Sequence, residues 1–347
     1  MNFFPLVRPA LGLVDPESAH RLTLLGLRWG FGPTDPAADP VALSISRFGL
    51  HFSNPLGIAA GFDKNGEVPD AMLAMGMGFA EVGTVTPRPQ SGNPRPRIFR
   101  LAHEGAVINR LGFNNEGHAS LRRRLEKRKA RGGIVGVNIG ANKDAADRIA
   151  DYELGIRTFE DLASYFTVNI SSPNTPGLRA LQGRGELEAL MTRVLKARTL
   201  NVPILLKIAP DLTDVDRADI AAVALDLKLD GLIVSNTTIE RDGLVSGAHA
   251  KETGGLSGKP LFAMSTKVLA DIYRLTGGKI PLIGVGGIAS GADAYKKIRN
   301  GASLIQLYSA LTYDGPDLVT RIKRELAENL KRDSFACLED AIGIDVK

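Results

Sequence analysis

The 347-residue chain is 44% hydrophobic and 23% charged, and its 43 basic and 38 acidic residues leave a formal charge of +5. These values lie near the averages for globular proteins, which excludes wholesale disorder and a fibrous repeat. Because Cys337 is its single cysteine, the chain holds no intramolecular disulfide, iron–sulfur cluster or cysteine-ligated zinc site.

Residues 1–32 are predicted to form two short amphipathic helices, and a Pro-rich linker follows. Asp15-Pro16-Glu17 combines an N-cap, a proline in the first turn and an acid near the helix start. Two interpretations remain open: a lid packed on the main domain, or a helix pair lying in a bilayer interface. We therefore divide the chain into an extension with its linker over 1–40 and a main domain over 41–347. The N-terminus lacks a signal-peptide pattern and no apolar run reaches 18 residues, so we expect no membrane-spanning helix.

Eight short apolar runs, alternating with helical stretches, make up the main domain. The runs cover residues 55–60, 79–84, 134–139, 166–170, 203–208, 231–234, 281–285 and 303–308. Helices are predicted between them, for example over 115–130, 185–200, 214–227 and 314–331. Nearly continuous Val, Ile and Leu are typical of strands buried on both faces, and eight strand–helix units predict an α/β fold, the (β/α)8 TIM barrel. The intervals after the second and sixth strands are longer, so we expect extra loops over the C-terminal face.

The alternative is an open, doubly wound sheet. Residues 284–289 match the dinucleotide pattern G-x-G-x-x-A. However, Ile305 and Gln306 stand about 20 residues further on, where that pattern requires an acid. We therefore interpret the match as a false positive.

The residues that follow the strands are amides, hydroxyls, glycines and two lysines, and in a barrel they meet at one mouth. There is no carboxylate pair for glycoside hydrolysis, and the five histidines are too scattered for a metal site, so we expect no metal. Glycines after the seventh strand and Ser309 after the eighth predict a phosphate pocket. A phosphate beside many neutral donors indicates flavin mononucleotide, FMN, as the ligand.

Several motifs, in order, carry a resemblance that covers nearly the whole chain. They lie at residues 54–57, 59–64, 92–97, 109–115, 169–177, 255–258 and 284–288. The glycine motifs are weak singly, but Asn-Arg-Leu-Gly-Phe-Asn-Asn and Asn-Ile-Ser-Ser-Pro-Asn-Thr-Pro-Gly on one barrel are specific. The sequence resembles the quinone-dependent (class 2) dihydroorotate dehydrogenases. The resemblance implies oxidation of (S)-dihydroorotate to orotate in pyrimidine (UMP) synthesis, with electrons passing through FMN to a membrane quinone.

By this resemblance, Ser172 is the catalytic base that takes the substrate's C5 proton, where class 1 enzymes have a cysteine. The lone Cys337 lies far from every motif, and the N-terminal helix pair is a class 2 feature. A serine hydroxyl is a poor base at neutral pH and needs a water-excluded site and an acceptor for its own proton.

The resemblance also assigns binding residues. The substrate-binding residues are Lys64, Asn109, Arg110, Leu111, Gly112, Phe113, Asn169, Asn174, Asn236 and Thr237. The FMN-binding residues are Ala60, Gly61, Lys64, Thr84, Asn138, Asn169, Lys207, Ser235, Gly258, Gly287, Tyr308 and Ser309. The quinone-tunnel residues are His20, Arg100 and Tyr308. Amides suit the alternating donors and acceptors of a pyrimidine ring, and Lys207 suits the negative charge of a reduced flavin.

We expect a monomer without an obligate protein partner, peripheral on the cytoplasmic face of the cell (inner) membrane. The basic run at 122–131 is interpreted as a solvated helix face, so we expect no nucleic-acid binding. Rival interpretations are a fumarate-using class 1 enzyme, a tRNA dihydrouridine synthase, or a binding protein that has lost catalysis on a barrel scaffold.

Overall fold

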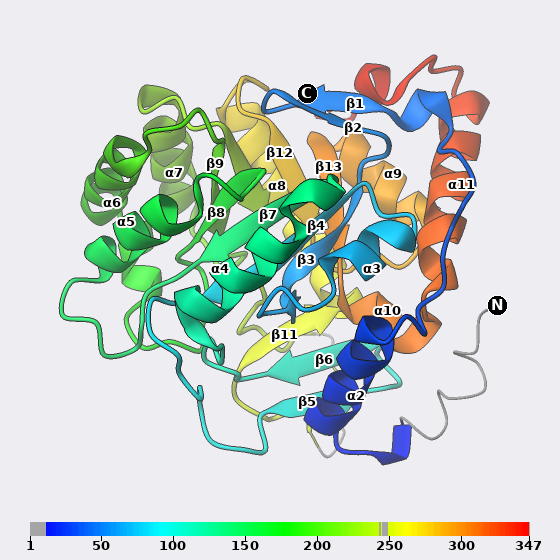
Figure 1. Cartoon of the computed structure of the whole chain (residues 1–347). Coiled ribbons are helices and arrows are strands. Elements are labelled where there is room, and N and C mark those ends of the chain that lie inside the picture. Colours follow the sequence, from blue (N-terminus) through cyan, green and yellow to red (C-terminus); the bar gives the residue numbers. More distant parts are fainter. Residues whose placement is uncertain (1–11, 243, 245–248, 347) are drawn as a thin grey trace.

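Eight parallel strands close into a barrel in the computed structural model, which describes residues 12–242, 244 and 249–346 (Figure 1). The strands are β3 (Leu56–Asp63), β4 (Phe79–Val85), β7 (Ile134–Ile139), β8 (Tyr165–Asn169), β9 (Ile204–Ile208), β10 (Gly231–Val234), β12 (Leu282–Val285) and β13 (Ala302–Leu307). They neighbour one another in chain order, and β13 pairs with β3 to close the ring. Closure confirms the predicted (β/α)8 fold and excludes the open sheet.

Helices follow the strands and cover the barrel. They are α3 (Pro69–Ala74), α4 (Gly117–Arg128), α5 (Arg148–Phe159), α6 (Arg184–Ala197), α7 (Asp214–Asp226), α8 (Phe262–Leu275), α9 (Gly291–Arg299), α10 (Ser309–Asp314) and α11 (Asp317–Arg332). Short polar side chains begin several of them: Thr213 and Asp216 form a capping box on α7, and Ser290 caps α9. Every barrel strand begins within one residue of its predicted start.

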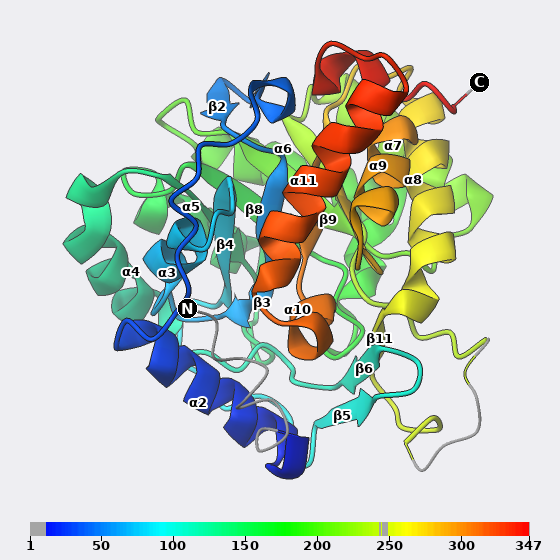
Figure 2. The same ribbon diagram turned by 90° about the vertical axis from the view of Figure 1, so that its right-hand side faces the viewer.

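The two long intervals form one small sheet over the C-terminal mouth of the barrel. The strands β5 (Ile98–Leu101) and β6 (Ala106–Asn109) follow β4, and β11 (Gly255–Gly258) follows β10. They pair antiparallel in the order β11-β6-β5 around their own apolar cluster. Both views place this sheet beside the N-terminal helix α2 (Pro16–Arg28), at the end opposite the hairpin of β1 (Ile45–Arg47) and β2 (Leu50–Phe52) (Figures 1 and 2).

Helix α2 begins where the sequence predicts, with the Asp15 carboxylate accepting a hydrogen bond from the Ser18 amide at 2.9 Å. The segment before residue 12, which the sequence assigns to a further helix, lies outside the described residues. Among the described residues, no helix combines the length and apolar character needed to cross a membrane.

The linker after α2 is fastened to the barrel through one buried lysine. Lys323 of α11 donates to Asp39 at 2.7 Å and pairs with Asp35 at 3.0 Å. Asn54, at the entrance to the first barrel strand, donates to the same Asp39 carboxylate at 2.7 Å. The path of the chain from α2 into the barrel is therefore fixed.

The basic run lies mainly on α4, with Leu121 and Leu125 turned inward as predicted. Most of its arginines are paired with acids: Arg122 with Asp161, and both Arg128 and Arg131 with Asp70. Arg128 is buried rather than solvated and also donates to the Gly132 carbonyl at 2.6 Å. Neighbouring carboxylates therefore neutralise much of this basic face.

Candidate active site

A cavity of about 1160 Å³ lies at the C-terminal mouth of the barrel, between the strand ends, the β5-β6-β11 sheet and α2. Most predicted site residues line it: His20, Ala60, Gly61, Lys64, Thr84, Arg100, Asn109, Leu111, Gly112, Phe113, Asn169, Ser172, Asn174, Lys207, Ser235, Asn236, Thr237, Gly258, Gly287, Tyr308 and Ser309. Residues from the ends of all the barrel strands except β7, and residues of the extension, thus face one space.

Two predicted residues do not line the cavity. Arg110 pairs with Glu252 at 2.6 Å and stacks on the Phe99 ring at 4.5 Å. Asn138 is fully buried beneath the cavity wall. The structure therefore places Arg110 in a surface cluster on the small sheet and Asn138 in a supporting layer.

The floor of the cavity rests on a buried network around Glu81, which the sequence analysis missed. The Glu81 carboxylate accepts hydrogen bonds from Asn138 at 2.8 Å, from Tyr165 at 3.0 Å and from Gln306 at 2.7 Å. The available signal was an acid inside the apolar run of β4, since such an acid needs partners when buried.

This network fixes the amide orientations above it. Because the Asn138 amide nitrogen faces Glu81, its oxygen accepts from Thr84 at 2.6 Å and from Asn169 at 3.2 Å. Asn169 also donates to the Thr84 hydroxyl at 2.9 Å. A ligand resting on this floor therefore meets donors and acceptors whose directions are set by the barrel.

Lys207 at the end of β9 is buried and faces the cavity. In the described part of the chain its ammonium group has no hydrogen bond or ion pair. Burial lowers the pKa of Lys207, and the charge of Glu81 opposes that shift. An unpaired buried cation beside a row of amides fits a flat ligand that carries or acquires negative charge.

Ser172 lies on the loop after β8, with 6% of its surface exposed. Its hydroxyl oxygen accepts a hydrogen bond from the backbone N–H of Asn174 at 3.2 Å. The neighbouring Thr175 hydroxyl is buried and has no partner among the described residues. The loop therefore holds Ser172 at the cavity wall in a nearly dry position.

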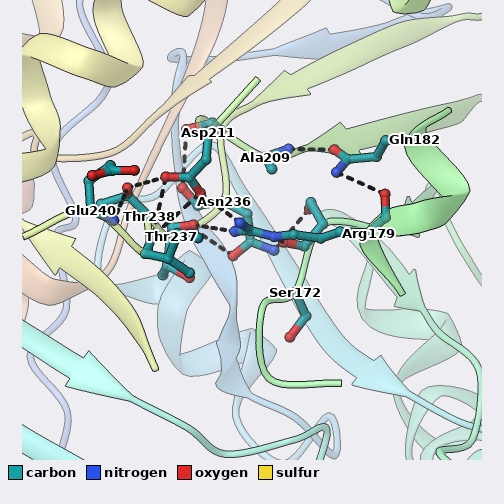
Figure 3. Close-up of polar contacts among 12 residues, drawn as sticks. Ser172, Arg179, Gln182, Ala209, Asp211, Asn236, Thr237, Thr238 and Glu240 are labelled. Atoms are coloured by element: carbon teal, nitrogen blue, oxygen red, sulfur yellow. Dashed lines mark hydrogen bonds and ion pairs between the residues drawn. The ribbon is translucent and has the colours of Figure 1, made fainter. Parts of the chain in front are cut away.

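Arg179 ties this loop to the one after β10, and the sequence analysis missed it. Its guanidinium donates to the Ser171 carbonyl at 3.0 Å and to the Thr237 carbonyl at 2.9 Å, and it pairs with Asp211 at 2.7 Å. Figure 3 shows this network, and the Ser172 side chain lies outside the hydrogen bonds that Arg179 forms. Arg179 thus fixes two cavity loops and leaves the Ser172 hydroxyl free of the ion pair.

Lys64 at the end of β3 donates to the Gly61 carbonyl at 2.7 Å and lines the cavity. Burial, with a contribution from Arg97, lowers the pKa of Lys64 to about 8, and the charge of Glu17 on α2 opposes the shift. The adjacent Asp63 carboxylate caps the Glu67 and Val68 amides at 2.8 and 2.7 Å, which shapes this turn. Lys64 is therefore a cation at neutral pH, close enough to titration for pH to alter its charge.

On the α2 side, His20 packs against aromatic rings. Its ring lies 5.4 Å from Phe62 and 6.2 Å from Tyr308, and its Nε2 has no partner among the described residues. Burial and the charge of Lys64 lower the pKa of His20 to about 3, so the ring is neutral. Arg100 donates to the Gly12 and Val14 carbonyls, each at 3.2 Å, at the approach to α2. On this side of the cavity the His20, Phe62 and Tyr308 rings form a neutral aromatic surface, and Arg100 supplies a positive charge at its edge.

At the opposite end, glycines form a cradle after β12. Gly286 and Gly287 have φ values of +109° and +77°, and a Cβ on Gly287 would lie 2.5 Å from Phe262. No described group accepts a hydrogen bond from the Gly287 N–H. Beside the cradle, Ser309 donates to Ser257 at 2.8 Å. Free amides in a glycine turn at this end of a barrel suit a phosphate, so cradle and floor together fit a flavin nucleotide.

In the described ranges, no group of three or more His, Cys, Asp or Glu side chains is arranged to hold a metal ion.

Known proteins resemble the chain over its whole length. The profile of the family described as "Dihydroorotate dehydrogenase" matches residues 42–330. "Dihydroorotate dehydrogenase (quinone)" of Parvibaculum lavamentivorans is 72% identical over 346 residues, covering 100% of this chain and 99% of the relative. The protein of the same name from Brucella melitensis is 58% identical, covering 99% and 96%. The crystal structure of DHODH from Eimeria tenella with ferulenol has a TM-score of 0.93 at 44% identity, covering 95% and 96%.

Proposed function

The chain belongs to the dihydroorotate dehydrogenase family, in its quinone-dependent class, and from this premise we propose which of its residues carry the reaction. The enzyme oxidises dihydroorotate to orotate in pyrimidine biosynthesis and uses a quinone as electron acceptor. It is a flavoprotein, and we propose FMN as the flavin. The observation that carries the assignment is the convergence of Ser172, Lys64 and the unpaired Lys207 on one cavity.

FMN supplies a hydride acceptor for C6 of the substrate and a carrier of electrons to the quinone. Lys207 lies at the floor, where its charge stabilises negative charge on the flavin's pyrimidine edge. Thr84 and Asn169 present fixed hydrogen-bonding groups there. Asn138 acts on the ligand indirectly, because its amide oxygen accepts from both residues and so fixes their orientation. At the other end, the free Gly287 N–H, with Gly258 and Ser309 beside it, would hold the phosphate of the cofactor.

The substrate occupies the part of the cavity next to Ser172. The Asn109, Asn174 and Asn236 amides match the donors and acceptors of the pyrimidine ring. Asn174 already donates to Asn109 at 3.3 Å, so these amides share one side of the site. Lys64 binds the carboxylate of the substrate. Leu111, Gly112 and Phe113 pack against the ring and exclude water.

Ser172 takes the C5 proton as general base. Its hydroxyl is nearly dry and takes part in no ion pair, which suits a group that must pass its own proton onward. The cations Lys64 and Lys207 favour the negative charge that develops when the proton leaves. Arg110 contributes through the packing of the small sheet, because its guanidinium is held by Glu252.

The quinone enters from the α2 side, past His20, Arg100 and Tyr308. Large apolar side chains are exposed on α2 and on the turn that follows it: Leu22 is 52% exposed, Trp29 72% and Phe31 76%. Arg21 and Arg28 lie on the same helix and share one carboxylate, Glu67, at 2.5 and 3.7 Å, so the pair keeps an excess positive charge that suits anionic headgroups. We propose that the enzyme is a monomer, peripheral on the cytoplasmic face of the cell membrane, and that residues 1–40 form the membrane and quinone extension of a 41–347 catalytic domain.

An anaerobic titration tests the whole proposal. Dihydroorotate added to the purified enzyme should bleach the visible flavin absorbance, and a quinone analogue should restore it. The released flavin should co-migrate with FMN on chromatography. Flavin that does not bleach with dihydroorotate, or that is reoxidised faster by fumarate than by quinone, would contradict the assignment.

A further inference from the structure

Lys297 on α9 is a buried lysine that the reaction described above does not use. Its side chain is 0% exposed and forms no ion pair with any described residue. The ammonium group donates to the Ser265 hydroxyl at 2.6 Å and lies 5.1 Å from the centre of the Phe262 ring. A buried cation without a carboxylate partner destabilises a fold unless something nearby compensates it.

The contacts of Lys297 lead to the glycine cradle. Ser265, on the first turn of α8, accepts from Lys297. Its own hydroxyl proton is shared between the Gly286 carbonyl at 3.1 Å and the Phe262 carbonyl of its own helix at 3.2 Å. Phe262, over which the ammonium lies, is the residue that a Cβ on Gly287 would strike at 2.5 Å. Lys297 therefore stands directly behind the cavity wall formed by Gly286 and Gly287.

This arrangement sets the direction of one peptide group. The Gly286–Gly287 peptide bond is not among the cis bonds, so its C=O and N–H point in opposite directions. Because the Gly286 carbonyl is held toward Ser265, the Gly287 N–H is turned toward the cavity. That N–H has no acceptor in the described part of the chain, as expected of a donor reserved for a ligand.

We propose that Lys297 is a positioning residue for the phosphate of FMN: through Ser265 it holds the Gly286–Gly287 peptide with its N–H toward the phosphate, and its charge makes the cradle select a phosphomonoester over an uncharged hydroxyl. The inference rests on the proposed cofactor. Asp293 favours the protonated lysine from a distance, but no described carboxylate pairs with Lys297, and the phosphate dianion supplies the remaining compensating charge. Burial lowers the pKa of Lys297 well below its usual range, with Asp293 opposing the shift, so a nearby anion strengthens its protonated form.

The test compares FMN with riboflavin, which lacks only the phosphate. Holoenzyme is equilibrated with equal excesses of both flavins, freed of unbound flavin, and the bound FMN:riboflavin ratio is measured by chromatography. Lys297→Met removes the charge and keeps the length, and we expect the ratio to fall at least about tenfold, as for loss of a charge-assisted interaction. Ser265→Ala should lower it about fivefold, as for one neutral hydrogen bond. The matched control is Lys296→Met on the exposed face of α9, which should keep the parent ratio.

A purely structural role predicts a different result. Lys297→Met would then weaken both flavins equally or neither, leaving the ratio unchanged, and the inference would be overturned. We expect the variant to unfold at the parent temperature or higher, because methionine replaces an unpaired buried charge. If it does not fold, Ser265→Ala decides: a folded Ser265→Ala enzyme with the parent ratio overturns the inference. A parent enzyme that contains no flavin overturns the proposed cofactor as well, which distinguishes the two failures.

Discussion

The floor of the cavity and its α2 roof are built from different interactions. In the floor, Glu81, Asn138 and Asn169 are buried, and their hydrogen bonds come from the barrel itself. The roof packs apolar residues such as Leu24 inward and is fastened at its edge by ion pairs, chiefly Glu17 with Arg97 at 2.6 Å. The floor network and the largely buried Glu17–Arg97 pair are both costly to disturb, but the floor network lies within the barrel, whereas the ion pair joins α2 to the barrel domain only at the edge of the helix.

The difference separates two tasks. A floor with fixed donors and acceptors orients a polar ring and discriminates among ligands by hydrogen bonding. A roof of apolar side chains and neutral rings accepts a hydrophobic molecule and can be altered without unfolding the barrel. The comparison therefore predicts that the half-reactions with dihydroorotate and with quinone can be impaired independently.

The largest effect is expected at Ser172. Ser172→Ala should lower the rate of flavin reduction by dihydroorotate by about 10²–10⁴-fold, the usual contribution of a general base. The flavin should stay bound, because the floor is untouched. Anaerobic stopped-flow absorbance measures the rate. Reoxidation by quinone after chemical reduction is the internal control and should be unchanged; a parent-like reductive rate would remove the base assignment.

Deleting the α2 extension should impair the other half-reaction. A chain that begins at residue 31 keeps the Lys323 clamp on Asp35 and Asp39, so the barrel should still fold. Quinone reduction should fall about a hundredfold, as for loss of a positioned binding surface, while flavin reduction by dihydroorotate changes little. Steady-state assays with quinone and stopped-flow reduction measure the two, and lipid-vesicle sedimentation should show loss of binding. Normal quinone turnover by the truncated enzyme would contradict the role of the roof.

A single substitution in α2 tests the same separation of the two half-reactions without removing the helix. Glu17→Gln removes the charge that holds α2 to Arg97 and Arg95. In steady-state kinetics well below pH 8, where Lys64 keeps its proton, we expect a raised KM for quinone and an unchanged KM for dihydroorotate. Equal changes in the two constants would mean that floor and roof are not separable.

The barrel could be predicted from the sequence because each strand is a local signal. The run at 134–139 and the run at 231–234 coincide with β7 and β10 residue for residue. The small sheet could not be predicted, since β6 pairs with β11 across some 150 residues and neither strand exceeds four residues. Such pairing depends on where the barrel places the two insertions.

The site was predictable to the extent that motifs lie at strand ends. Lys64, Ser172 and Lys207 face one cavity because parallel strands deliver their carboxyl ends to one mouth. Supporting residues such as Glu81 and Arg179 carry no local pattern, because their roles arise from partners on other strands and loops. Arg110 belongs to a motif and was therefore predicted to bind substrate, but its side chain pairs with Glu252 and does not line the cavity.

The pH dependence of dihydroorotate oxidation should report the charge of Lys64. With a pKa of about 8, Lys64 loses its proton above that pH, and kcat/KM for dihydroorotate should then fall, at most about tenfold per pH unit. Lys64→Arg should remove this alkaline limb, because an arginine stays charged. Glu17→Gln should move the limb to lower pH, since Glu17 helps to hold the proton. A limb that stays in place in Lys64→Arg would exclude Lys64 as its source.

The smallest expected effect is on the pH dependence of stability, and it is tested by comparing variants of two buried histidines, His118 and His20. His118 on α4 packs on Phe159 at 5.1 Å, its ring nitrogens have no partner among the described residues, and burial lowers its pKa to about 4. In the unfolded chain this histidine takes up its proton near pH 6.5, whereas in the folded chain it does so only near pH 4. The free energy of unfolding therefore has its full value above pH 6.5 and falls by up to about 3 kcal/mol as the pH drops toward 4. His118→Leu should flatten this slope, measured as urea midpoints across pH. His20→Leu should not, although its pKa is also lowered, because protonating His20 releases α2 rather than the barrel. Equal flattening by both variants would mean that α2 unfolds together with the barrel, and the distinction between floor and roof would fail.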